Sequence, residues 1–260
     1  MADWVLLLPP AEGKSKGGWH LVPPESPFLG QIPALKPARE LLYGHLIRFL
    51  EAGTGLDQLL GVKGKHLLDA VTSNIQLESA PVMPAVDRYG AGVMYRALQF
   101  PDLPPLAQER LLFQTFIFSG LFGLLRPDDL IPLYKLKADA TLPPLGKVSS
   151  YWRPILSPIL NTACAGKTVW NLLPQAYAAT WEPDGHAKTV VEVDFLQFKN
   201  GIPKTVSHGV KPLRGALIQF LATRNVHDPA QLAEWDAPNG FVMHELHMEN
   251  KRTRVTFLKG

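Results

Sequence analysis

Proline is abundant in this chain and is not confined to one segment: 24 of the 260 residues are proline. Proline fixes its own φ angle and donates no backbone hydrogen bond, so it limits how far a regular helix or strand can run. We therefore expect many short elements joined by stiff turns. The hydrophobic content of 46% is that of a folded protein, and the length suits one large domain with a sizeable core.

The spacing of apolar residues predicts both helices and strands. Residues 4–8 form a continuous apolar run typical of a buried strand, and residues 190–195 alternate as a strand does. Helical spacing is present in residues 38–50 and 65–75. No change of composition marks a boundary, so we expect one mixed α/β domain spanning residues 1–260. Further strands are predicted at residues 169–172, 204–207, 241–246 and 255–258, and further helices at 106–112, from 151 and at 213–223.

A glycine turn in the middle of the chain is the most informative local feature. Gly120 and Gly123 follow an apolar, strand-like segment, and Arg126 comes just after them. Glycine lets the backbone approach a ligand closely, and arginine supplies a planar cation with five donors. This pattern indicates a phosphate-binding corner. On spacing alone it also fits an ordinary strand-to-helix turn.

Basic residues are concentrated near the carboxyl terminus. No acidic residue occurs between Asp194 and Asp228, although the net charge of the chain is only +3. Lys211 and Arg214 lie three apart at the start of a predicted helix, where both would share a face and the helix terminus itself favours anions. The segment is either a surface that meets anions or a solvated face balanced by acids from elsewhere.

The loop after the first strand carries Glu12 and Lys14. The end of a strand in an α/β sheet is a common place for a ligand, although both residues could be ordinary exposed charges. The Gly13–Lys14 pair is not a Walker motif, because Leu8 occupies the position where that motif needs a glycine. Further along, Arg88 and Tyr89 fit either a cleft lining or a packed helix.

No metal site is predicted. His244 and His247 lie three apart on a probable strand, which would point them to opposite faces. The single cysteine, Cys164, excludes an internal disulfide and is interpreted as a buried structural thiol.

Three motifs together resemble one known family. The central one runs Ser119-Gly-Leu-Phe-Gly-Leu-Leu-Arg-Pro-Asp128 and continues through Pro132-Leu-Tyr-Lys-Leu136 and Tyr151-Trp-Arg153. It is flanked by Leu8-Pro-Pro-Ala-Glu-Gly-Lys14 and by Ser207-His-Gly-Val-Lys-Pro-Leu-Arg-Gly215. In this order the motifs resemble the YaaA family, also called DUF328 or UPF0246.

The resemblance implies a YaaA-like fold with a mixed central sheet surrounded by helices. It also implies a cytoplasmic protein that protects cells during peroxide stress and binds DNA through a helix-hairpin-helix element, here expected at residues 120–123. The chain departs from the family pattern at Ala138, Asp139 and Gln219, which leaves a shared ligand in doubt and favours a specialised role.

Three functions follow as hypotheses. The first is binding of DNA or a phosphate-bearing ligand in a basic cleft, with contacts from Gly120, Gly123, Arg126, Lys211 and Arg214. The second is an enzyme in the same cleft, with a specialised biosynthetic role, acting on a small nucleotide-like or carboxylate-bearing substrate. The third is a protein-interaction module that uses the proline-rich residues 23–37. The expected pocket comprises Glu12, Lys14, Arg88, Tyr89, Tyr134, Trp152 and Ser207, and an enzyme would use Glu12, Lys14, Arg126 and Tyr134.

Cofactors and membrane contacts are not expected. No segment approaches the roughly 20 apolar residues that a membrane-spanning helix needs. A cytoplasmic monomer is the expected form.

Overall fold

The apolar run Trp4–Leu8 forms β1, at the centre of an eight-stranded sheet. The computed structural model describes residues 3–21, 26–199, 202–206 and 209–260. β1 is hydrogen-bonded in parallel to β8 on one side and to β3 on the other, and all five of its residues are buried. Its unbroken apolar character follows, because a parallel strand covered by helices on both faces has no solvent-facing side.

The sheet has a parallel centre and antiparallel edges. Its order is β11-β12-β9-β8-β1-β3-β4, and β10 pairs with β9 off this path. Strands β12, β9, β8, β1 and β3 run parallel, whereas β11, β10 and β4 pair antiparallel with their neighbours. The bounds are β3 (Thr115–Ser119), β4 (Gly123–Leu125), β8 (Thr168–Asn171), β9 (Thr189–Lys199), β10 (Ile202–Thr205), β11 (Phe241–Glu249) and β12 (Arg252–Lys259).

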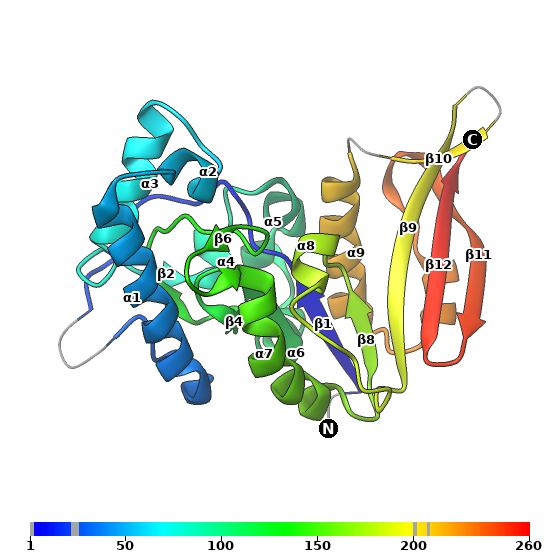
Figure 1. The fold of residues 1–260 in the computed structure, drawn as a ribbon. Helices are drawn as coiled ribbons and strands as arrows, with labels where there is room; N and C mark the ends of the chain where they lie inside the picture. Colours follow the sequence, from blue (N-terminus) through cyan, green and yellow to red (C-terminus); the bar gives the residue numbers. More distant parts are fainter. Residues whose placement is uncertain (1–2, 22–25, 200–201, 207–208) are drawn as a thin grey trace.

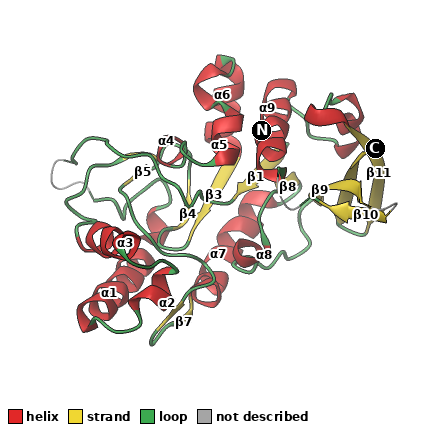
Figure 2. Cartoon of the chain, turned by 90° about the horizontal axis from the view of Figure 1, so that it is seen from above, coloured by secondary structure: helices red, strands yellow, loops and turns green. Residues whose placement is uncertain are grey.

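Helices cover both faces of the sheet. Figure 2 shows α5, α6 and α9 on one face and α7 on the other, with α1, α2 and α3 grouped beyond the β4 edge. The helices are α1 (Lys36–Ala52), α2 (Leu56–Leu60), α3 (Lys65–Ile75), α4 (Ala85–Arg88), α5 (Val93–Leu98), α6 (Pro105–Gln114), α7 (Val148–Cys164), α8 (Gln175–Ala178) and α9 (Val210–Arg224). Two small two-stranded ladders, β2 (Met83–Pro84) with β5 (Leu130–Ile131) and β6 (Thr141–Leu142) with β7 (Gly146–Lys147), complete the strands.

This architecture confirms the predicted mixed α/β fold with a central sheet. Cys164, at the end of α7, is buried as expected, and desolvation raises the pKa of its thiol to about 12. Residues 200–201, between the predicted strands 190–195 and 204–207, lie outside the described residues, as does Ser207. No helix in the described ranges combines the length and apolarity needed to cross a bilayer.

The central glycine turn joins two strands and no helix. It connects β3 to β4 in an antiparallel hairpin in which Ser119 pairs with Gly123. The predictions of a helix-hairpin-helix at residues 120–123 and of a strand-to-helix turn are therefore wrong. Both glycines are buried. A Cβ on Gly120 would lie 2.8 Å from the carbonyl carbon of Lys137, and one on Gly123 would lie 2.9 Å from the Trp152 ring. The glycines therefore permit close internal packing.

Candidate functional site

A cavity of about 430 Å³ lies at the carboxyl end of β1. Figure 1 shows β1 ending between α5 and α8, with α9 alongside. The position is the one that open α/β sheets use for ligands. Its lining comes from five segments far apart in the sequence, namely residues 9–14, 91–95, 134–139 and 174–177, together with Lys211 and Arg214 at the start of α9.

Basic side chains outnumber acidic ones in this cavity. Five are basic and two are acidic, so the lining has an excess of three positive charges when all are ionised. Such a concentration in a partly enclosed space attracts anions more strongly than the same charges spread over a surface. The basic residues are Lys14, Lys135, Lys137, Lys211 and Arg214, and the acids are Glu12 and Asp139.

Lys14 lies within the cavity wall. Its Nζ donates a hydrogen bond to the carbonyl oxygen of Ala11 at 3.2 Å and lies 4.4 Å from the centre of the Tyr134 ring. Desolvation, aided by the positive charges of Lys135 and Arg88, lowers the pKa of Lys14 to about 7. A large fraction of the amine is therefore neutral at physiological pH.

Glu12 is engaged by two other lysines. Its carboxylate lies 2.8 Å from Lys137 Nζ and 3.5 Å from Lys135 Nζ. The hydrogen bond from Lys137 is the main cause of the lowered pKa of Glu12. Glu12 is thus a fixed anion that offsets these two ammonium groups and leaves the other three basic groups without a carboxylate within 4 Å among the described residues.

Arg214 and Lys211 project from the first turn of α9. The helix begins after Gly209, which has a φ of 99°, and its amino terminus reinforces the local positive potential. Among the described residues, Arg214 Nε is buried and has no hydrogen-bond partner. Desolvation lowers the pKa of this guanidinium. A buried, unpaired donor on a charged group is costly, and a bound anion would remove that cost.

Tyr134 connects the cavity to the glycine turn. Its hydroxyl lies 2.8 Å from Ser119 Oγ and 2.6 Å from the Tyr89 hydroxyl, and all three groups are buried. Ser119 Oγ also accepts a hydrogen bond from the backbone of Phe122. The turn therefore supports the cavity wall from behind rather than contacting a ligand.

The structure separates the sequence-predicted residues into two sets. Glu12, Lys14, Tyr134, Lys211 and Arg214 line the cavity. The other described residues of the predicted set do not line it: Tyr89, Trp152, Gly120 and Gly123 are buried, and Arg88 and Arg126 donate to backbone carbonyls. Ser207 lies outside the described residues.

Arg88 and Arg126 do not face the cavity because both donate hydrogen bonds to backbone carbonyl oxygens. The Arg88 guanidinium donates to the carbonyl oxygens of residues 15, 17, 81 and 131 and is completely buried. Arg126 donates to the carbonyl oxygens of Phe113 and Thr115, and its guanidinium lies 3.9 Å from the centre of the Phe116 ring. Both hold segments of the fold together.

Lys135, Lys137 and Tyr177 line the cavity but were not predicted. Both lysines lie within three residues of Tyr134, which was predicted, and this closeness in the sequence is the signal that could have found them. Tyr177, in the short helix α8, lies in a part of the sequence with no recognisable motif.

A second basic feature lies at the turn between α2 and α3. Residues 61–64 join the two helices, and Gly61 and Gly64 have φ angles of 65° and 55°. Lys63 and Lys65 are exposed. A Cβ built on Gly61 would lie 3.8 Å from Lys137 Nζ, so this turn adjoins the cavity.

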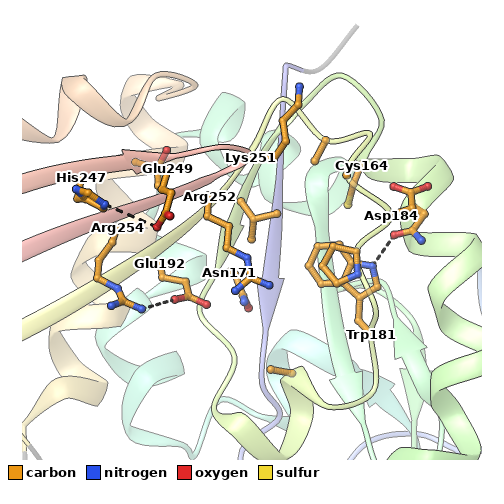
Figure 3. Close-up of a pocket in the computed structure, with 17 residues that line it drawn as sticks. Cys164, Asn171, Trp181, Asp184, Glu192, His247, Glu249, Lys251, Arg252 and Arg254 are labelled. Atoms are coloured by element: carbon orange, nitrogen blue, oxygen red, sulfur yellow. Dashed lines mark hydrogen bonds and ion pairs between the residues drawn. The ribbon is translucent and has the colours of Figure 1, made fainter.

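Another cavity of similar size lies between the end of α7 and strands β9, β11 and β12. Three acidic side chains match its three lysine and arginine side chains in number. Figure 3 shows two pairs among its charged groups. Arg254 contacts Glu192 at 3.3 Å, and His247 contacts Glu249 at 3.9 Å. Among the described residues, no group of three or more His, Cys, Asp or Glu side chains is placed to hold a metal ion. The internal pairing makes this cavity a weaker anion site.

Comparisons with known proteins agree on one family. Residues 5–246 match the family model described as "Peroxide stress protein YaaA". A UPF0246 protein of Streptomyces coelicolor is 33% identical over 234 residues, which cover 88% of each chain. A UPF0246 protein of Corynebacterium efficiens is 35% identical over 222 residues, 84% of this chain and 85% of its own. An uncharacterized protein of Campylobacter jejuni is 26% identical over 252 residues, 96% of this chain and 97% of its own.

Proposed function

Because the chain belongs to the YaaA family of peroxide stress proteins, we propose that its role in that response depends on binding a small phosphate-bearing ligand in the basic cavity. One observation carries the proposal: near the start of α9 and beside Lys211, Arg214 Nε is buried without a hydrogen-bond partner in the described part of the chain. A phosphate oxygen would supply the missing acceptor and would meet a second cation and a helix terminus at the same place.

The rest of the cavity suits the organic part of such a ligand. Tyr134 and Tyr177 offer aromatic surface, and residues 91–94 add small and apolar groups. A volume of about 430 Å³ falls within the range of small-molecule sites, roughly 300–1,000 Å³. A nucleotide-sized molecule is the largest ligand that this space suggests.

Isothermal titration calorimetry with inorganic pyrophosphate and a panel of nucleotides tests this proposal. Arg214→Met keeps the aliphatic stem but removes the donors, and we expect it to weaken binding about tenfold or more. Lys188→Met is the matched control, since Lys188 is an exposed cation outside the cavity. Equal affinity in both variants, or no binding by the wild type, would contradict the proposal.

DNA binding is a second candidate, favoured by the turn between α2 and α3. The backbone amides of Lys65 and His66 open α3 and have no hydrogen-bond partner among the described residues. Open amides at a helix terminus, flanked by exposed lysines, can hold a backbone phosphate without reading base sequence. In this proposal the turn between α2 and α3, and not residues 120–123, contacts the DNA backbone.

Titration of a short DNA duplex at several salt concentrations separates the two candidates. If the turn binds DNA, the double variant Lys63→Ala/Lys65→Ala should weaken binding. The slope of log affinity against log salt concentration should also decrease by about the value expected for two phosphate contacts. Arg214→Met should leave this affinity nearly unchanged. Duplex binding that is independent of salt, or unaffected by the double variant, would rule out this route.

A further inference from the structure

Lys14 differs from the other cavity lysines in what it contacts. Its Nζ has one hydrogen bond, to the carbonyl oxygen of Ala11, and lies over the Tyr134 ring. The nearest cavity carboxylate, Glu12, is held by Lys137 at 2.8 Å and Lys135 at 3.5 Å. Lys14 is thus an amine at the cavity wall without an ion-pair partner among the described residues.

We propose that the Lys14 amine forms an imine with a small aldehyde or ketone that also carries an anionic group. Lys211 and Arg214 would hold that group, and the Tyr134 ring would lie against the new C=N bond. This inference rests on the anion site proposed above and adds the reactive group of the ligand and the residue that captures it. The ligand class is therefore a phosphorylated or carboxylated carbonyl compound.

The chemistry requires a neutral amine, which this environment supplies. Burial and the nearby charges of Lys135 and Arg88 favour the neutral form of Lys14. Its lone pair attacks the carbonyl carbon, a C–N bond forms, and the C=O π electrons move to oxygen. A proton then passes from nitrogen to that oxygen. The hydroxyl group takes up a second proton from solvent and leaves as water, and the nitrogen lone pair completes the C=N bond as a protonated imine.

The product retains one positive charge at the nitrogen. That charge would lie over the Tyr134 ring, where the ammonium group now lies 4.4 Å from the ring centre. Cation–π attraction to this ring therefore stabilises the protonated imine. The tyrosine itself is fixed from behind by Ser119 and Tyr89, so the ring needs no rearrangement.

Lys137 is the matched comparison within the same cavity. It shares the lining and is of the same residue type, but its ammonium group is paired with Glu12. An ion pair stabilises the charged, unreactive form. Imine formation should therefore select Lys14 over Lys137, which lines the same cavity.

Borohydride trapping tests the inference. The wild-type protein is incubated with pyridoxal phosphate as an aldehyde probe, reduced with sodium borohydride, digested and analysed by mass spectrometry. Lys14 should be modified at least about tenfold faster than Lys137, which is paired with Glu12, or the exposed Lys188, because desolvation favours the neutral form of Lys14. Pyridoxal, which lacks the phosphate, should label Lys14 several-fold more slowly, and pyrophosphate should compete with pyridoxal phosphate.

Each result has a defined meaning. Modification that follows surface exposure, with Lys14 no faster than Lys188, would overturn the inference even if pyrophosphate binds in calorimetry. In that case the proposed anion site would remain supported, and only imine formation at Lys14 would be contradicted. Fast labelling of Lys14 that Arg214→Met slows several-fold would support both. Fast labelling that ignores Arg214→Met and the phosphate of the probe would overturn the anionic part of the proposal.

Discussion

Two groups of basic side chains in this molecule have opposite surroundings. Arg39 and Arg88 are completely buried, and each donates to four backbone carbonyls drawn from distant segments. Lys14, Lys211 and Arg214 line a cavity, and none has a carboxylate within 4 Å in the described part of the chain. The first group, which we call the framework arginines, completes the fold. The second group, the cavity cations, leaves binding capacity unused.

The difference teaches that burial of a cation does not by itself identify a binding site. A guanidinium whose donors are all met by carbonyls has nothing left for a ligand. A cation that is partly desolvated and lacks acceptors raises the free energy of the empty protein, and this cost is recovered when an anion binds. The following substitutions test that distinction, from the largest expected effect to the smallest.

Removing a framework arginine should cause the largest loss of stability. Arg88→Met leaves four backbone carbonyls without their donors, and we expect the free energy of unfolding to fall by about 3 kcal/mol or more. Chemical denaturation measures this change. The cavity variant Arg214→Met should be within about 1 kcal/mol of the wild type, since Nε has no partner to lose among the residues that the structure describes. Equal losses in the two variants would remove the distinction.

Adding one methyl group at the glycine turn should be the next most damaging change. In Gly120→Ala the new Cβ would collide with the backbone of Leu136 and Lys137, at a cost of about 2 kcal/mol. Gly13→Ala is the control, because a Cβ there meets no atom within 4 Å. Thermal unfolding compares the two. If Gly120→Ala is as stable as Gly13→Ala, the glycine turn does not pack closely against the backbone of Leu136 and Lys137.

Replacing a cavity cation should stabilise the protein while removing function. Lys14→Met eliminates a desolvated amine, and we expect a gain of about 1 kcal/mol below pH 7, together with weaker pyrophosphate binding. The folded-state pKa of Lys14, about 7, is below its ordinary value of 10.5, so the unfolded chain binds more protons between these two values. Wild-type stability therefore rises with pH across that window, and the advantage of the variant should shrink there.

That pH profile involves the charged and titratable groups that face Lys14, which are Glu12, Lys135, Arg88, Tyr89 and Tyr134. Urea denaturation of both proteins from pH 6 to pH 10 measures it. A constant difference across this range would show that Lys14 titrates at its ordinary pKa.

The smallest effect is expected from the cavity carboxylate. Glu12→Gln frees the ammonium groups of Lys135 and Lys137, which now lie 3.5 and 2.8 Å from its oxygens. We expect pyrophosphate affinity to rise a few-fold at low salt, equivalent to about 0.5–1 kcal/mol, and the gain to fade as salt screens the charges. Calorimetry at two ionic strengths is the measurement, and weaker binding by the variant would indicate that Glu12 itself contacts the ligand.

The mixed fold could be predicted from local patterns because the strands and helices that form its centre are locally encoded. The continuous apolar run in β1 and the helical spacing in α1 and α3 required no tertiary information. The glycine turn was misread because its glycines serve packing: only the folded chain shows that Gly120 faces the backbone of residues 136–137 and that Gly123 faces Trp152.

The candidate site could be predicted only in part for a related reason. Four of the cavity residues lie near the ends of regular elements. Glu12 and Lys14 follow the end of β1, and Lys211 and Arg214 lie near the start of α9. Side chains at such positions can meet at one edge of the sheet. Arg88 and Arg126 have the same chemistry in the sequence, yet carbonyls from remote segments satisfy them. No local sequence pattern predicts which carbonyl groups will lie near an arginine. The framework arginines and the cavity cations therefore cannot be distinguished from the sequence alone.

The pH dependence of Lys14 acetylation, measured by mass spectrometry with and without pyrophosphate, tests the central claim most directly. If the cavity holds uncompensated cations that receive an anion, the midpoint should lie near 7 in the free protein and should rise when pyrophosphate is bound. A midpoint near 10 that pyrophosphate does not move would contradict the account.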